Sequence, residues 1–181
     1  MLLIVVCAAG PAADVGTLVA LARADGWDCR VVCTPTAVSF VDISALERLT
    51  GHPVRSSYRP AGTPRDPQPP VDAVVVAPAT FNTVNKLAAG LADNYALGVL
   101  AECVGDVPVV IVPFVNAALA RRAPFRRAVG ELRAEGARVL LAEPPHPRGG
   151  GAAVAFPWGA ALTALRETGP GDQSGPGPAT V

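Results

Sequence analysis

The chain has 181 residues, half of them hydrophobic, and fifteen basic residues balance fifteen acidic ones, so its formal net charge is zero. This length suits one domain with a substantial core, and the balanced charge argues against a nucleic-acid-binding protein. No apolar run reaches the ~18 residues of a membrane span, and the apolar start lacks the flanks of a signal peptide, so we expect a cytoplasmic protein without membrane partners.

Short apolar runs alternate with helical patterns along the first part of the chain. Leu2–Val6 is a continuous apolar run, which is typical of a strand buried on both faces. Apolar residues at helical spacing then predict a helix from residue 15 to a stop at 25–26. Residues 28–33 read as a second strand, and 38–50 as a helix in two pieces.

The second part of the chain repeats this alternation after a break. Residues 53–70 contain six prolines and predict a long irregular loop. Further strands are expected at 71–77, 107–112 and 138–141, and further helices at 82–91, 93–104, 117–135 and 158–167. A second loop is expected at 144–151, and the Gly/Pro-rich residues 168–181 predict a disordered tail.

Strands that alternate with helices predict a parallel sheet with helices on both faces. Ligands in such sheets bind beyond the carboxyl ends of the strands. The turns after Val6, Cys33, Val76 and Val112 are therefore the places where a site is expected. The four cysteines lack the spacing of a metal site and are expected to be reduced and buried.

The first two strands end in segments that suit either a tight turn or an anion site. Small residues at 8–13 let the backbone approach a ligand, but they form neither a dinucleotide fingerprint nor a P-loop, and a plain strand-to-helix turn explains them equally well. The hydroxyls of Thr34, Thr36 and Ser39 suit helix capping or phosphate binding.

The later strand ends are more informative. Residues 77–86 carry two hydroxyls, two amides and a lysine at one strand end, where capping requires a single polar group. Asn116 follows the next strand, where an asparagine caps a helix or holds a substrate carboxylate or amide.

These segments resemble one family. Ala-Pro-Ala-Thr-Phe-Asn-Thr (77–83), Lys86 and Gly-Leu-Ala-Asp-Asn (90–94) resemble the motif of the homo-oligomeric flavin-containing cysteine decarboxylases. That family includes phosphopantothenoylcysteine decarboxylase and the peptidyl-cysteine decarboxylases of lantibiotic synthesis. Residues 31–41 resemble its second phosphate-side segment, and 113–116 resemble its Pro-x-Met-Asn substrate motif, with Val115 in place of Met. The resemblance runs from about residue 2 to 165.

The resemblance implies an α/β, flavodoxin-like (Rossmann-type) three-layer sandwich with a parallel sheet. It implies an FMN-binding domain over residues 1–167, a small-molecule or peptidyl-cysteine substrate, and homotrimers or dodecamers built from trimers. Carried over by position, the FMN phosphate lies near Ala9, Gly10, Ala12 and Thr34. The isoalloxazine lies near Phe40, Ala79, Thr80, Asn82 and Thr83, and Asn116 faces the substrate carboxylate.

The chain departs from the family at its catalytic histidine, which lies shortly before the Ala-Pro motif; residues 63–67 contain none. His52, Asp66 and His146 are the candidate bases, and each also suits a surface loop. The late loop at 146–151 lacks the cysteine of the phosphopantothenoylcysteine enzymes. The sequence therefore favours FMN binding over decarboxylation.

Two alternatives follow from these departures. One is an FMN-binding protein without decarboxylase activity: a flavin carrier, a prenyl-flavin-related enzyme or a regulatory subunit. The similar flavin prenyltransferases need a set of phosphate-binding arginines and a lysine that this sequence does not show. The other alternative is a binding module that has lost its flavin, and the polar cluster at 80–83 argues against it.

Overall fold

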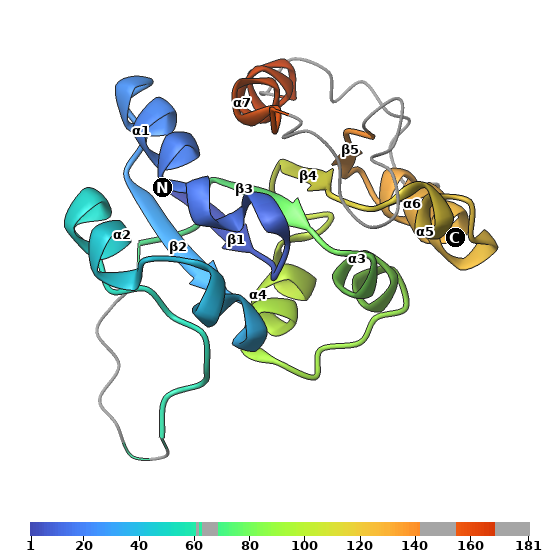
Figure 1. Ribbon diagram of the computed structural model, residues 1–181, viewed down its shortest axis with the longest axis horizontal. Coiled ribbons are helices and arrows are strands. Elements are labelled where there is room, and N and C mark those ends of the chain that lie inside the picture. Colours follow the sequence, from blue (N-terminus) through green and yellow to red (C-terminus); the bar gives the residue numbers. More distant parts are fainter. Residues whose placement is uncertain (61, 63–68, 142–154, 169–181) are drawn as a thin grey trace, which may run out of the picture.

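The computed structural model describes residues 1–60, 62, 69–141 and 155–168. Within them the chain forms one five-stranded sheet in the order β2-β1-β3-β4-β5, and every neighbouring pair is parallel (Figure 1). The strands are β1 (Leu2–Val6), β2 (Cys29–Cys33), β3 (Ala73–Ala79), β4 (Val109–Pro113) and β5 (Arg138–Val139). This order is that of flavodoxin-like folds and confirms the predicted fold class.

The strands form because their residues are apolar and buried on both faces. Every residue of β1, β3 and β4 is buried. The register aligns Leu2 with Cys29 of β2 and with Ala73 of β3. The three strands therefore start together, and β3 runs two residues beyond the ends of β1 and β2. The segments that follow them meet at one edge of the sheet.

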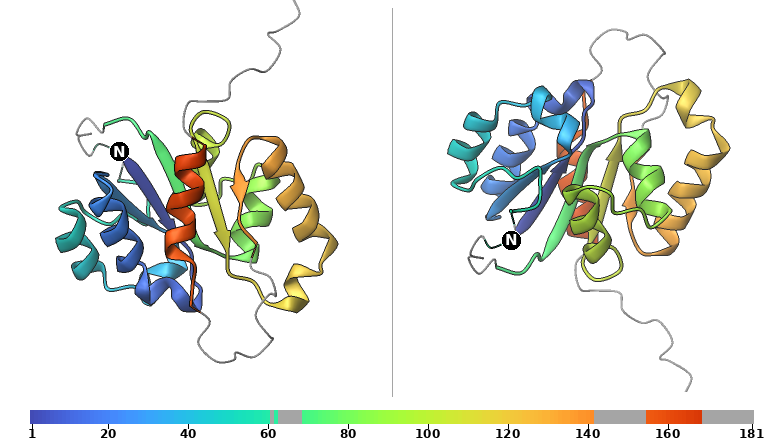
Figure 2. Two further views of the ribbon diagram at one scale, coloured as in Figure 1. Left: turned by 90° about the horizontal axis from the view of Figure 1, so that it is seen from above. Right: turned by 90° about the horizontal axis from the view of Figure 1, so that it is seen from below.

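Helices cover both faces of the sheet (Figure 2). Helices α1 (Gly16–Ala24), α2 (Ile43–Thr50) and α7 (Trp158–Glu167) bury their apolar residues on one face, and α3 (Phe81–Ala88), α4 (Tyr95–Cys103) and α6 (Ala123–Ala134) on the other. Three short helices, η1 (Gly10–Asp14), η2 (Pro35–Phe40) and α5 (Ala117–Ala120), follow β1, β2 and β4. Alternate residues of a strand point into the two cores on opposite faces of the sheet. Leu2 and Ile4 pack with α1 and α7, and Leu3 and Val5 pack with α3, α4 and α6.

The helix expected over 38–50 forms in two pieces, as predicted. Its first piece is the 3-10 helix η2, which begins earlier, at Pro35. The second, α2, begins where the Asp42 carboxylate accepts a hydrogen bond from the Ala45 amide at 2.9 Å. Gly51 ends α2 with a φ of 75°, a left-handed conformation that favours glycine.

The single helix predicted over 117–135 is wrong. The structure has two helices, α5 and α6, separated at Arg121 and Arg122. Pro124 lies in the first turn of α6, and because proline has no N–H it cannot donate to the carbonyl of Ala120. The last strand is also shorter than predicted, because β5 pairs with β4 only at Arg138 and Val139.

Part of the irregular loop predicted over 53–70 lies along the sheet edge. The Arg55 amide donates to the Val31 carbonyl at 3.2 Å, and the Arg55 carbonyl accepts from the Cys33 amide at 2.8 Å. The predicted loop at 144–151, and all but Thr168 of the predicted tail, lie outside the described residues. None of the helices described here has the length and apolarity to cross a membrane.

Candidate functional site

The carboxyl ends of β2, β1 and β3 form the centre of the candidate site. The Thr34 amide donates to the Val6 carbonyl at 2.9 Å, and the Cys7 amide donates to the Pro78 carbonyl at 3.1 Å. The three strand ends are therefore tied to one another. Along the chain, β2 is added on one side of β1 and β3 on the other, so the strand order reverses here. The carboxyl ends of β1 and β3 therefore hold the topological switch point at which parallel sheets bind ligands.

The segment after β1 is a turn built from small residues. Ala9 has an extended backbone (φ −140°, ψ 158°) and precedes η1, and Ala12 is fully buried beneath it. A methyl group added at Gly10 would contact only the Phe114 ring, at 3.8 Å. Gly10 itself is exposed. No bulky side chain from this turn covers the main chain, which leaves its polar groups accessible to a ligand.

The segment after β2 adds a hydroxyl and an aromatic ring. Thr34 is buried and extended, and it precedes η2 without forming a side-chain capping hydrogen bond. Capping therefore does not explain Thr34, whereas Ser39 does bond locally, to the Thr36 carbonyl at 3.1 Å. At the end of η2, Phe40 remains 42% exposed, which is unusual for a ring of this size.

Three side chains lock the segment after β3 to the end of β1. The Thr80 hydroxyl accepts from the Thr83 amide at 3.3 Å and lies 3.1 Å from the Thr83 hydroxyl. The Cys7 thiol donates to the Thr83 hydroxyl at 3.3 Å. Burial raises the pKa of Cys7, although these threonines lower it in part, so the thiol stays protonated and remains a donor. This chain of contacts fixes the start of α3 at the switch point.

Most of the other polar groups in this motif have structural partners. The Asn85 amide donates to the Phe81 carbonyl at 2.7 Å. Lys86 pairs with Asp93, and the hydrogen bond from Lys86 lowers the pKa of that carboxyl. Asn94 caps α4 by accepting from the Leu97 amide. By contrast, Asn82 is exposed on the first turn of α3, where its amide faces solvent.

Asn116 follows β4 and lies at the same edge of the sheet. The Phe114 amide donates to the Ala79 carbonyl at 2.8 Å, which ties the end of β4 to the end of β3. The Asn116 side-chain oxygen accepts from the Leu119 amide at 3.0 Å and caps α5. Since the oxygen is used in this cap, only the Nδ2 hydrogens of Asn116 can act on a carboxylate.

An aromatic row beside this edge was not predicted. The Phe114 ring lies 6.1 Å from the Phe156 ring, which lies 4.4 Å from Trp158 at the start of α7. Phe156 and Trp158 are more than 40 residues from Phe114 in the sequence. No local pattern indicated this pairing, because only the packing of α7 on the sheet brings the rings together.

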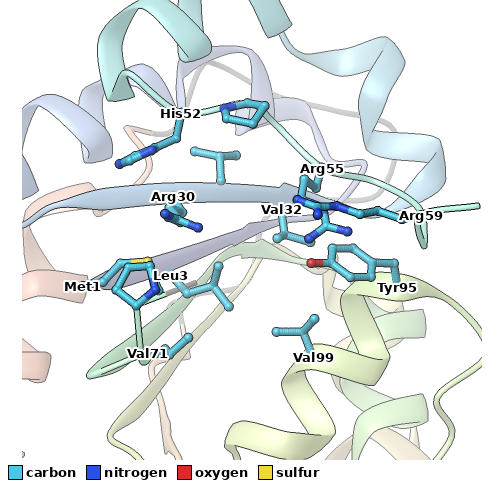
Figure 3. Close-up of a pocket in the computed structure, with 13 residues that line it drawn as sticks. Met1, Leu3, Arg30, Val32, His52, Arg55, Arg59, Val71, Tyr95 and Val99 are labelled. Atoms are coloured by element: carbon cyan, nitrogen blue, oxygen red, sulfur yellow. The ribbon is translucent and has the colours of Figure 1, made fainter. Parts of the chain in front are cut away.

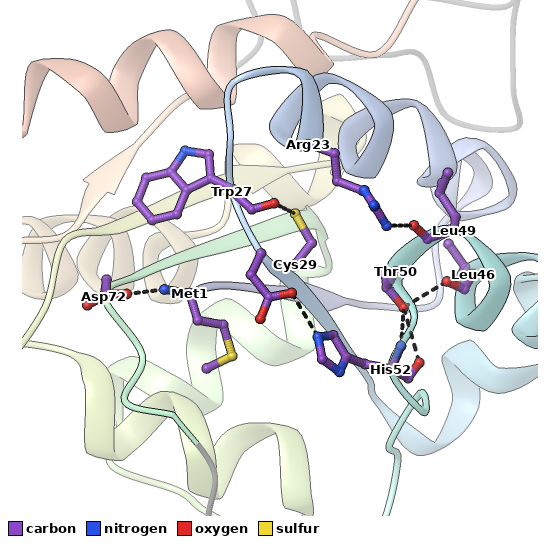
Figure 4. Close-up of polar contacts among 10 residues, drawn as sticks. Met1, Arg23, Trp27, Cys29, Leu46, Leu49, Thr50, His52 and Asp72 are labelled. Atoms are coloured by element: carbon purple, nitrogen blue, oxygen red, sulfur yellow. Dashed lines mark hydrogen bonds and ion pairs between the residues drawn. The ribbon is translucent and has the colours of Figure 1, made fainter.

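His52 does not join the strand-end residues within one chain. Its Nε2 lies 2.7 Å from an oxygen of Asp28, which immediately precedes β2 (Figure 4). The pair therefore lies at the amino ends of the strands, opposite the candidate site. Asp66 and His146, the other candidate bases, lie outside the described residues.

The four cysteines are free and buried, as the sequence predicts. Burial raises the pKa of Cys33 to about 12 and that of Cys29 to about 11. Within the described residues, no group of three or more His, Cys, Asp or Glu side chains is arranged to hold a metal ion. These thiols therefore act as core residues.

The curated relatives are larger proteins. The chain is 35% identical over 117 residues to the coenzyme A biosynthesis bifunctional protein CoaBC of Mycobacterium bovis and of Mycobacterium tuberculosis. This match includes 61% of the chain but only 27% of the relatives' length. The chain thus corresponds to about a quarter of each bifunctional protein.

Similar solved structures match nearly the whole chain. The FMN-dependent cysteine decarboxylase SpaF is 27% identical, with a TM-score of 0.72 over 92% of this chain and 95% of that one. The cypemycin decarboxylase CypD is 25% identical, with a TM-score of 0.70 over 92% and 91%. The sequence also matches the Flavoprotein family over residues 2–159. This chain therefore belongs to the Flavoprotein family and has the fold of FMN-dependent cysteine decarboxylases.

Proposed function

We propose that this protein binds FMN at the carboxyl ends of β1, β2 and β3, in a domain that spans residues 1–167. The main support for the proposal is the series of hydrogen bonds among Cys7, Thr83 and Thr80 at the switch point. These residues lie beside a turn of small residues. The fold of FMN-dependent decarboxylases supports it, since a flavin in such a fold lies at this place.

The residues present suit the two ends of the cofactor. Around Ala9 and Gly10 the side chains are small, so main-chain amides can reach a phosphate. The buried Ala12 supports this turn, because its amide donates to the Ala9 carbonyl at 2.9 Å. The Thr34 hydroxyl, which forms no capping hydrogen bond, follows the neighbouring strand. On the other side of the switch point, the half-buried Thr80 and the exposed Asn82 offer polar groups to an isoalloxazine ring, above the buried Ala79 and Thr83. Phe40 supplies an exposed aromatic face.

We further propose that the substrate is a cysteinyl compound, either a small molecule or a peptide that ends in cysteine. Bound FMN supplies a two-electron acceptor for oxidation at the thiol-bearing carbon, and the substrate carboxylate leaves as carbon dioxide. The Nδ2 group of Asn116 donates to that carboxylate and orients it. We assign no catalytic base, since His52 is paired with Asp28 at the opposite edge.

The position of His52 favours a second candidate function. Residues 63–67, where the family histidine is expected, contain none. A missing general base removes about 10²–10⁴-fold of rate. The second candidate is therefore an FMN-binding protein without decarboxylase activity, which serves as a flavin carrier, a prenyl-flavin-related enzyme or a regulatory subunit.

We place the protein in the cytoplasm and propose that it forms homotrimers or dodecamers of trimers. A reducing compartment keeps the four buried cysteines as thiols, as they are in this structure. In a trimer, a neighbouring subunit covers Phe40 and closes the flavin site from outside.

The first experiment is an absorption spectrum of the purified protein with and without added FMN, followed by anaerobic addition of a cysteinyl peptide. Bound oxidised flavin that bleaches with release of carbon dioxide supports the decarboxylase. Bound flavin that stays oxidised supports the second candidate. A protein that neither contains nor takes up FMN contradicts both.

The variant Asn116→Asp separates binding from turnover. A carboxylate at position 116 still caps α5, so folding and FMN uptake are expected to match the wild type. It lacks the Nδ2 donor and repels the substrate carboxylate, so bleaching is expected to slow at least about tenfold. Unchanged bleaching in this variant contradicts the role assigned to Asn116.

A further inference from the structure

A second candidate site lies on the face of the sheet that α4 covers. It is a pocket of about 340 Å³ over β1 and β2, bounded by α4 and by the segment that follows α2 (Figure 3). Its volume lies in the range of small-molecule pockets. Its walls include apolar side chains, among them Leu3, Val32, Val71 and Val99.

The pocket carries a concentration of positive charge. Arg30, Arg55 and Arg59 line it together with His52, and no carboxylate does so among the described residues. Asp28 accepts a hydrogen bond from His52 and is not part of the lining. A chain with zero net charge thus gathers three guanidinium groups around one cavity.

One of these groups has an unused donor. The Nε atom of Arg30 is buried without a hydrogen-bond partner in the structure. Buried polar groups are almost always paired, because an unpaired one loses its hydrogen bonds to water without replacement. The Arg55 guanidinium lies 4.6 Å above the Tyr95 ring, and that stacking holds it at the pocket wall while leaving its edge free to donate. The Arg30 Nε donor is therefore available to an acceptor on a ligand.

The pocket and the proposed flavin site lie on different parts of the sheet. The pocket opens on the face of the sheet covered by α4, and the flavin site lies at the edge. Arg30 lies four residues before Thr34, which corresponds to about 13 Å along an extended chain. Arg55 lies closer, because its carbonyl accepts from the amide of Cys33, the residue before Thr34. Titration with and without FMN therefore decides whether the two sites bind independently.

We propose that this pocket binds a phosphate monoester with a small apolar or aromatic body. The guanidinium groups of Arg30 and Arg55 together match the near-dianionic charge of a phosphate monoester better than that of a monoanion. Guanidinium groups also suit phosphate oxygens because they donate two parallel hydrogen bonds. The apolar wall formed by Leu3, Val71 and Val99 accommodates the body of the ligand.

Isothermal titration with phenyl phosphate tests the proposal, with inorganic phosphate and benzoate as comparison probes. Each titration is run on the protein with and without FMN, so the result does not depend on the flavin proposal. Phenyl phosphate is expected to bind tighter than inorganic phosphate, which lacks the apolar body, and tighter than benzoate, which carries less charge.

Two variants locate the site. Arg30→Met and Arg55→Met keep the apolar stems, and each is expected to weaken phenyl phosphate at least about tenfold. Arg127→Met, at an exposed position on α6, removes the same charge elsewhere and is expected to leave binding unchanged. No binding by wild type, equal binding of benzoate, or equal loss in all three variants overturns the proposal.

Discussion

The Thr83 hydroxyl connects two segments of the candidate site, although Thr83 lies inside a helix. It accepts from Cys7, which directly follows β1, and pairs with Thr80, so one hydroxyl joins the ends of two strands to the start of α3. Its residue is 4% exposed, so water does not replace these contacts when they are lost.

Replacing Thr83 by valine is therefore expected to lower the free energy of unfolding by about 1–2 kcal/mol. The shape is kept, but the Cys7 thiol loses its acceptor. Thr163→Val is the matched control, because that exposed helical hydroxyl bonds only to the Gly159 carbonyl within α7. Urea unfolding measures the loss of unfolding free energy in each variant. Equal losses in the two variants are incompatible with a special role for Thr83.

Cys33 gives the stability a measurable pH dependence. Burial, and to a lesser degree the neighbouring Cys7, raise the pKa of Cys33 from 9.0 to about 12. A raised folded-state pKa means that the unfolded thiol ionises first. The contribution of the protonated Cys33 thiol to the free energy of unfolding is therefore complete below about pH 9. It is lost as the pH rises toward the folded-state pKa of about 12.

The variant Cys33→Ala is expected to flatten this alkaline decline. Above the unfolded pKa, each pH unit costs about 1.4 kcal/mol for one such group, and the variant loses that contribution. The measurement is the slope of unfolding free energy against pH, compared above and below pH 9. If the unfolding free energies of the wild type and of Cys33→Ala fall equally steeply above pH 9, the thiol of Cys33 is not the cause of the decline.

At the scale of elements, α4 is the support for the segment that follows α2. The Tyr58 and Tyr95 rings meet edge to face at 5.3 Å, and the Tyr58 hydroxyl lies against Gly98 in the middle of α4. A methyl group at position 98 would overlap that hydroxyl. Tyr58 is 61% exposed, however, so its ring can move away.

A double-mutant cycle tests this contact. In the Tyr58→Ala background, Gly98→Ala is expected to stabilise by about 0.8–1 kcal/mol, the helix preference of alanine over glycine. In the wild-type background the gain is expected to be offset by loss of the ring contact, which is worth about 0.5–1.5 kcal/mol. Thermal unfolding of the four proteins gives the coupling. An equal effect of Gly98→Ala in both backgrounds contradicts the contact.

The elements also show what the sequence was able to predict. β1 was predicted to the residue, because a continuous apolar run has one stable environment, the middle of a covered sheet. The strands β2, β3 and β4 begin one or two residues later than predicted, and β3 and β4 also end later. The break before α6 was missed although Pro124 was visible, because the helical pattern on both sides was read as one element. Boundaries that depend on pairing, such as the early end of β5, require the neighbour to be known.

The site was predictable to a lesser degree. The strand ends were located from topology alone, but the polar cluster after β3 was interpreted as mostly ligand-binding. The structure shows that Asn85 and Lys86 bond within their own surroundings. The pocket around Arg30 was not anticipated, since it joins residues from β1, β2, α4 and two loops that no local pattern connects.

At the scale of the whole molecule, the apolar surface near the flavin site points to self-association. Val38 and Phe40 are 39% and 42% exposed on η2, directly after the strand that ends at the candidate site. Large exposed apolar side chains beside a binding site are typical of surfaces that another chain covers. The trimer proposed above would cover them.

The expected assembly of three 18.4 kDa chains has a mass of about 55 kDa, which sedimentation equilibrium measures directly. Phe40→Ser is expected to shift this assembly toward monomers and to weaken FMN at the same time, because the ring serves the interface and the cofactor together. Leu21→Ser is the matched control, since Leu21 is 41% exposed on α1 and belongs to neither surface. A wild type that stays monomeric while binding FMN would show that the flavin site is complete in one chain, and Phe40→Ser would then weaken FMN without changing the mass.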